Sequence, residues 1–186
     1  MNFPSVSELK SFSVFPCGES HVLEFKLTFP EKPEVLLSSI CALLNNGQEG
    51  HIVIGIHPTN YAIVGVPIHE RSQLDTLLLS IDNIIHNSML LCSDKSSVHP
   101  TSIIATAIDR GNQHVLIVIR IAPETGKTYM TAAGQTWYRL SASNYKVKSE
   151  EFMLRSAVES IVDKRIAKLK QEMDDLSRLV KSKKFT

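Results

Sequence analysis

The apolar residues of this chain change their spacing from two to three or four and back, and this change restricts the fold. Residues 21–29 alternate apolar and polar side chains, which is typical of a strand with one buried face. Residues 33–46 and 71–89 carry apolar side chains every three or four positions, which predicts two helices. The chain therefore contains both kinds of secondary structure within one stretch.

Short apolar runs follow each of these helices. The runs at 51–56 and 61–68 flank a polar turn, as do the runs at 102–109 and 114–122, and both pairs predict hairpins. Residues 128–140 allow a third hairpin. This order predicts an α+β fold of two similar lobes, each a helix plus a small antiparallel or mixed sheet, followed by a long C-terminal helix. A doubly wound parallel sheet is not expected.

The same elements divide the chain into three parts. Residues 1–17 mix Ser, Pro and aromatic residues without a period, and we expect an extended lead-in there. Residues 18–150 are expected to form the α+β domain. Residues 151–186 are expected to form a helix with a short coiled-coil seam and a basic tail.

The C-terminal helix, expected over about 149–183, carries an apolar seam. Successive members lie 4, 3, 4, 3 and 4 residues apart, which is coiled-coil spacing: Val162, Ile166, Leu169, Met173, Leu176 and Val180. Two to three heptads are marginal for an isolated coiled coil. The seam is therefore expected to pair with another chain or with a second copy, or else to fold back on its own domain.

The charge of the chain is balanced overall but not along its length. The 186 residues contain 20 Lys and Arg against 19 Asp and Glu. Residues 1–150 hold 11 Lys and Arg against 13 Asp and Glu, whereas residues 151–186 hold 9 against 6. This balance excludes a strongly basic nucleic-acid-binding domain, so phosphate contacts are expected from a local patch, the tail or a partner.

The three cysteines, Cys17, Cys41 and Cys92, lie far apart and form no CxxC pair. Their odd number argues for a reducing compartment and against a disulfide framework. No apolar stretch approaches the roughly 20 residues of a transmembrane helix, and the N-terminus lacks a signal-peptide pattern. We therefore expect a cytoplasmic protein without a membrane span, with the nucleus as the alternative location.

Glu19 and Glu24 are the residues best suited to chemistry. Glu19 precedes the first strand, and Glu24 lies on the polar face of that strand. Two neighbouring carboxylates can hold a divalent cation that activates water or stabilises a phosphodiester transition state. The alternative from the residues alone is a solvated Glu19 and a surface pair of Glu24 with Lys26.

A series of short motifs runs along the chain: Gly18-Glu19-Ser20, Leu23-Glu24-Phe25-Lys26, Ala42-Leu43-Leu44-Asn45, Glu49-Gly50, Ile54-Gly55-Ile56, Ile63-Val64-Gly65-Val66 and Trp137-Tyr138-Arg139-Leu140. Each motif is short, but their order and spacing over about 18–152 resemble the core domain of the Schlafen family. That core is a divergent AlbA-like module. The resemblance implies a role in RNA processing.

The resemblance also implies a catalytic site, from which this chain departs. In nuclease members of the family, three carboxylates and a divalent metal cleave structured RNA, and the first two acids map onto Glu19 and Glu24. The third family acid follows a strand that ends here at Ile56, but His57-Pro58-Thr59-Asn60 contains no acid. His57 or Asn60 could complete a site for Mg²⁺ or Mn²⁺, although Mg²⁺ prefers carboxylate oxygen. The departure predicts a weakened catalyst or a non-catalytic subunit, and we favour the second.

Two further contacts are implied by the family. Zinc is often held by its second lobe, but Cys92 lacks neighbouring ligands here, and His86 and His99 are poorly spaced around it, so zinc is not expected. Four basic residues are candidate phosphate contacts by resemblance to the family's basic channel, although each is more often a solvated surface charge: Lys26, Arg139, Lys146 and Lys148.

Three hypotheses follow. The first is an RNA-processing subunit of a composite metal-dependent endoribonuclease that acts on structured or small-RNA precursors, with another Schlafen-like subunit or a second copy bound through the C-terminal helix. The second is a non-catalytic module for nucleic-acid binding or assembly. The third is an autonomous homodimeric ribonuclease.

Overall fold

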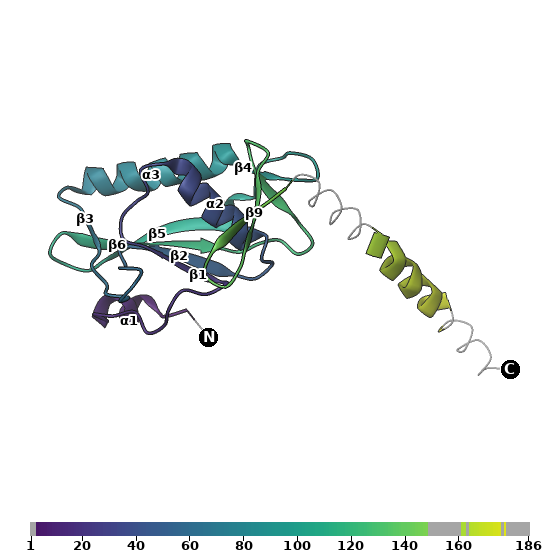
Figure 1. The fold of residues 1–186 in the computed structure, drawn as a ribbon, viewed down its shortest axis with the longest axis horizontal. Coiled ribbons are helices and arrows are strands. Elements are labelled where there is room, and N and C mark those ends of the chain that lie inside the picture. The colour runs from purple at the N-terminus through teal and green to yellow at the C-terminus, as the bar shows by residue number, and fades with distance from the viewer. Residues whose placement is uncertain (1–2, 149–160, 163, 176, 178–186) are drawn as a thin grey trace. The chain divides into compact units, whose positions relative to one another are not determined.

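The computed structural model describes residues 3–148, 161–162, 164–175 and 177. Its elements, shown in Figure 1, include the helices α1 (Val6–Ser11), α2 (Pro33–Leu44) and α3 (Arg71–Ser88), and a 3₁₀ turn at Pro100–Ser102. The strands are β1 (Leu23–Lys26), β2 (Gly50–Ile54), β3 (Val66–Pro67), β4 (Met89–Leu91), β5 (Ile103–Asp109), β6 (His114–Ile121), β7 (Tyr129–Thr131), β8 (Thr136–Arg139) and β9 (Asn144–Val147). The mixed α+β class predicted from the sequence is confirmed.

The main sheet contains five strands. β1 pairs in parallel with β2, β2 pairs antiparallel with β6, and β5 and β6 form the second predicted hairpin. β3 also pairs with β6, at Val115, and β5 pairs with that same residue from the other side. β2 and β3 therefore lie end to end along one edge of β6. Strands from both halves of the chain share this sheet, so the two expected lobes are joined through one sheet rather than having one each.

The first predicted hairpin forms only as a compact loop between β2 and β3. Ile56 and Ile63 make a single isolated bridge in place of a longer ladder. Inside the loop, the amide of Gly65 donates to the Gly55 carbonyl at 2.8 Å. Both glycines have positive φ, 106° and 79°, and a Cβ on Gly55 would lie 2.9 Å from the Cα of Gly65. Only glycine suits these two positions, because a side chain would meet both backbone strain and a clash.

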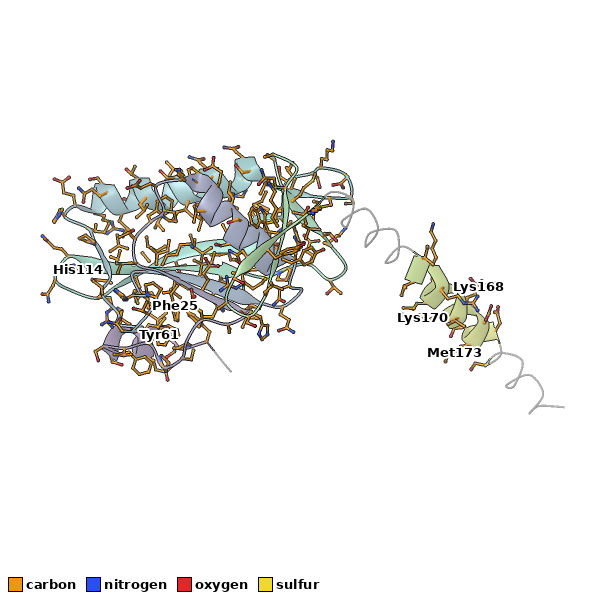
Figure 2. The ribbon with its side chains drawn as sticks, viewed as in Figure 1. Phe25, Tyr61, His114, Lys168, Lys170 and Met173 are labelled. Carbon is orange, nitrogen blue, oxygen red and sulfur yellow. The ribbon has the colours of Figure 1, made fainter. Side chains whose placement is uncertain are left out.

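Apolar side chains cover both faces of the main sheet. On one face, α2 and α3 pack against the strands through side chains such as Leu36 and Ile81. On the other face, α1 packs through Leu9 against a smaller cluster. Figure 1 shows α2 and α3 on one side of the sheet and α1 on the other. Phe25 and Tyr61, labelled in Figure 2, meet on the α1 side with ring centroids 5.8 Å apart.

The N-terminal segment differs from the extended lead-in that the sequence predicts over 1–17. It contains α1, which begins with a capping box between Ser5 and Glu8. The guanidinium of Arg110, beyond the end of β5, donates to two carbonyl oxygens at the C-terminal end of this helix. A six-residue helix shows too little periodicity to be recognised in the sequence, and its docking depends on a residue far along the chain.

Two small sheets, β4 with β7 and β8 with β9, complete the fold of residues 3–148. The third hairpin that the sequence allows over 128–140 is divided between them. Asn45 follows α2, and its side-chain amide donates to the carbonyls of Tyr129 and Trp137 at 2.9 Å. Its carbonyl oxygen accepts from the Tyr129 amide at 2.8 Å. One side chain thus fixes both small sheets to the end of α2.

The C-terminal segment is helical at every residue from Ile161 on that the structure describes. Four members of the predicted seam are between 44% and 70% exposed: Val162, Ile166, Leu169 and Met173. Leu176 and Val180 lie outside the described residues. Figure 2 labels Met173 on this helix together with Lys168 and Lys170. Across the described ranges, no helix has the length and apolar character needed to cross a membrane.

Candidate functional site

The outer edge of β1 carries the first motif found in the sequence. β1 pairs with β2 on one side only, so alternate backbone groups on its other side need partners. The amide of Phe25 donates to Oε1 of Glu19 at 2.7 Å. The carbonyl of Leu23 accepts from the Ser20 amide at 2.9 Å and from Nη2 of Arg139 at 3.1 Å. Glu19, Ser20 and Arg139 together close this edge of the sheet.

Glu24 points from β1 toward α2 and is buried. Its Oε1 accepts from Nζ of Lys26 at 2.6 Å and from the Ser39 hydroxyl at 2.7 Å. Its Oε2 accepts from Nη1 of Arg139 at 2.8 Å. These donors replace the water that a carboxylate loses on burial. The pair with Lys26 that the sequence suggests does form, but the strand face around it is covered.

Arg139 is one member of a closed ring of hydrogen bonds. Besides Glu24, its Nη1 donates to Oδ1 of Asn144 at 2.9 Å, and its Nε donates to the Ser20 carbonyl at 3.1 Å. The side-chain amide of Asn144 donates in turn to the Ser39 hydroxyl at 3.1 Å. The bond from Ser39 to Glu24 then closes the ring. The ring joins β1, α2 and the β8–β9 sheet. We call these four residues, Glu24, Ser39, Arg139 and Asn144, the Glu24 ring.

Ser39 and Asn144 are members of this ring that sequence reasoning misses. Ser39 does carry a signal, because it lies on the apolar face of α2 next to the buried Ile40, and a buried hydroxyl needs a partner. Asn144 carries no such signal in the sequence. Its bond to Ser39 spans 105 residues of sequence, and only the folded chain brings the two together.

The donor set around Glu24 does not fit a divalent cation. Among the described residues, no group of three or more His, Cys, Asp and Glu side chains could hold a metal ion. His57, the replacement for the third acid, places its Nδ1 3.0 Å from the Thr59 hydroxyl in the loop after β2. Both oxygens of Glu24 already accept from two cationic groups and a hydroxyl. The structure brings Glu19 and Glu24 to the same strand, but it does not bring His57 to them.

The four candidate phosphate contacts divide into two pairs. Lys26 and Arg139 are enclosed, and both bind the carboxylate of Glu24. Lys146 and Lys148 are exposed. The ammonium of Lys146 lies 5.8 Å from the ring centre of Trp137, within reach of a cation–π contact. Only the exposed pair is available to a phosphate without rearrangement of the fold.

The three cysteines are free thiols. Burial raises the pKa of the Cys41 thiol to about 12 and that of Cys92 to about 11. The Sγ of Cys41 lies 3.4 Å from the Tyr129 carbonyl oxygen, inside the core. A thiol with such a pKa is a poor metal ligand or nucleophile, because both roles need the thiolate.

Comparison with known proteins gives a family match and a structural likeness. No curated protein matches this chain. Among solved structures, the DIP2311 protein from Corynebacterium diphtheriae is similar at 16% identity and a TM-score of 0.46, over 76% of this chain. The match spans only 25% of that protein's length. A family model described as Schlafen, AlbA_2 matches residues 19–148, and the chain therefore belongs to this Schlafen family.

Proposed function

We propose that this chain is a non-catalytic, nucleic-acid-binding subunit of a larger assembly. Membership of the Schlafen family supports a nucleic-acid-related role. The observation that carries the proposal is the environment of Glu24, whose two oxygens accept from Lys26, Ser39 and Arg139. The acid that the resemblance marks as a metal ligand is thus used to hold β1, α2 and the β8–β9 sheet together.

The contact surface for nucleic acid in this proposal is the β8–β9 sheet. Leu140 and Tyr145 are 55% and 43% exposed there, and Lys146 and Trp137 lie side by side. Aromatic rings next to a lysine suit a single strand, because bases stack on the rings and the ammonium meets the phosphate. This local patch also agrees with the balanced charge of residues 1–150, which makes a strongly basic domain unnecessary to the proposal.

A composite endoribonuclease remains the second candidate, with the metal site supplied by a partner. Glu19 favours it, because among the described residues a hydrogen-bond donor, the Phe25 amide, meets only one of its carboxylate oxygens. In such an assembly this chain would position the RNA. The substrate class expected from the family resemblance is structured or small-RNA precursors.

The test measures RNA binding and Mn²⁺-dependent cleavage by the full chain, with Lys146→Ala and Glu24→Ala as variants. We expect binding without cleavage. Lys146→Ala should weaken binding similarly for all sequences and reduce the slope of log affinity against log salt by about one. Lys10→Ala, an exposed lysine on α1, is the matched control and should change neither quantity.

Cleavage provides the outcome that contradicts the proposal. Robust metal-dependent cleavage by the wild-type chain, abolished in a folded Glu24→Ala variant, would show that the chain is an autonomous ribonuclease. Cleavage that appears only in His57→Asp would show that the missing acid is what separates this chain from a catalyst. An absence of RNA binding at low salt would refute the binding role itself.

The seam of the C-terminal helix is the proposed assembly surface, and its four described members are exposed. Burying a leucine stabilises a contact by about 1.5–3 kcal/mol, so Leu169→Asp combined with Leu176→Asp should dissociate a partner or a second copy. Light scattering and co-purification measure this, and Gln171→Asp, off the seam, is the control. Unchanged mass and partner binding, with lower stability of the double variant, would instead support a helix that folds back on its own domain.

A further inference from the structure

A pocket of about 380 Å³ lies at the start of β1 and β2. Its walls include the rings of Phe3, Phe15 and His51, the thiol of Cys17 and the carboxylate of Glu49. Phe3 stacks on His51 with ring centroids 3.8 Å apart and planes inclined by 10°. The volume falls within the range of roughly 300–1,000 Å³ that is typical of pockets for small organic ligands.

The polar groups of the pocket lie where it meets solvent. Oε2 of Glu49 accepts from Nη2 of Arg120 at 2.5 Å, and its Oε1 lies 3.9 Å from Nε2 of His51. His51 and Arg120 face each other across β2 and β6. Burial, the largest influence, lowers the pKa of His51, so its ring is uncharged at neutral pH. The pocket therefore offers aromatic walls and one carboxylate, and the guanidinium of Arg120 is bound to that carboxylate.

We propose that this pocket binds one unpaired guanine of a single-stranded nucleic acid. A base stacks on the ring of His51 in the place that Phe3 takes in the free chain. Guanine presents two adjacent N–H donors on its Watson–Crick edge, N1–H and the N2 amino group, which match the two oxygens of a carboxylate. That edge must be free, so the base is unpaired. The guanidinium of Arg120 adds a positive charge for the neighbouring phosphate.

The position of the pocket connects it to the proposed contact surface. Ser20 and Leu23 line the pocket, and the carbonyls of both residues accept from Arg139 of β8. The edge of β1 thus contributes to the pocket and is bound by β8 through the same two residues. The inference rests on the proposed nucleic-acid-binding function and adds to it the base that the chain selects.

Fluorescence anisotropy of the full chain with two oligonucleotides tests the proposal. One is a uridine 12-mer, and the other carries a single central guanine; DNA versions of both separate a preference for RNA from a preference for the base. We expect the guanine to tighten binding roughly tenfold. Glu49→Gln should remove this difference, whereas Glu31→Gln, the same change at an exposed site outside the pocket, should preserve it.

Two further variants separate stacking from charge. His51→Ala should weaken binding of the guanine oligonucleotide to the level of the plain one, and His51→Phe should retain the preference because it keeps a flat ring. Alkylation gives the location directly, since Cys17 lines the pocket. The guanine oligonucleotide should slow alkylation of Cys17, whereas the uridine 12-mer should not.

The outcomes distinguish this inference from the function on which it rests. Binding of both oligonucleotides with equal affinity, or equal alkylation of Cys17 with and without the guanine oligonucleotide, would overturn the pocket and leave the binding function intact. An absence of binding to either oligonucleotide at low salt would overturn both.

Discussion

Two glutamate–arginine pairs connect distant parts of this chain, and they differ in burial rather than in chemistry. The pair of Glu24 and Arg139 has side chains 8% and 1% exposed, with an N–O distance of 2.8 Å. The pair of Glu49 and Arg120 has side chains 49% and 45% exposed, with an N–O distance of 2.5 Å. The shorter contact is thus the more exposed one. Distance alone would rank the two pairs wrongly as contributors to stability.

The difference follows from what surrounds each pair. Glu24 and Arg139 are enclosed by Ser39, Asn144 and backbone carbonyls, so each charge depends on fixed protein partners. Glu49 and Arg120 remain in contact with water, which can replace either partner. A buried pair of this kind holds elements in register, whereas a half-exposed pair can exchange its partner for a ligand. This is why we assign the first pair to the fold and the second to binding.

The largest expected effect is that of Arg139→Ala. Removing the guanidinium leaves the buried Glu24 carboxylate with Lys26 and the Ser39 hydroxyl as its donors, and it takes a donor from the Leu23 carbonyl. Breaking a buried pair from one side typically lowers the free energy of unfolding by about 3–5 kcal/mol. Urea unfolding measures this change. The matched change in the exposed pair, Arg120→Ala, should lower it by no more than about 1 kcal/mol.

Equal losses of unfolding free energy in the two alanine variants would contradict the contrast between the buried and the exposed pair. They would mean either that water reaches Glu24 in solution or that Arg120 contributes packing that its exposure conceals. Arg139→Ala could also lose much stability while its remaining folded protein binds RNA as wild type does. That result would support the contrast, because it would separate the stabilising pair from the contact surface.

Much of the fold could be predicted from local patterns. The spacing of apolar residues predicts α2 and α3, and two apolar runs around a polar turn predict the β5–β6 hairpin. α1 could not be predicted, since its docking depends on Arg110, a residue far from it in sequence. The pairing of β3 with β6 could not be predicted either, because a strand of two residues shows no alternation of apolar and polar side chains.

The candidate site also depends on contacts between distant residues that local sequence patterns do not reveal. The sequence marks Glu19 and Glu24 as acids near one strand, but it treats the face that carries Glu24 as polar and open. The structure covers that face with α2 and the β8–β9 sheet, so that Arg139, read as a surface phosphate contact, becomes the buried partner of Glu24. Burial depends on contacts between residues more than 100 positions apart, which a local pattern does not contain.

The smallest expected effect is the acid dependence of the exposed pair, measured with Glu49→Gln. The hydrogen bond from Arg120 is the main reason that the pKa of Glu49 lies below its ordinary range. A lowered pKa in the folded state stabilises the fold above the ordinary pKa of a glutamate, about 4.3. That contribution disappears as the pH falls through the lower, folded-state value. Wild type should therefore exceed Glu49→Gln by at most about 1 kcal/mol at pH 7, and the difference should shrink below pH 4.3.

Urea unfolding of both proteins between pH 7 and pH 3 gives this difference directly, and the subtraction removes the effect of other acids whose pKa values are also lowered, such as Glu8 and Asp94. Salt at about 0.5 M should reduce the difference at pH 7, because water and ions reach both partners. A difference that persists at pH 3 and in salt would show that Glu49 stabilises the chain through packing rather than charge. The carboxylate would then be less available to a ligand, and the contrast with Glu24 would lose its physical basis.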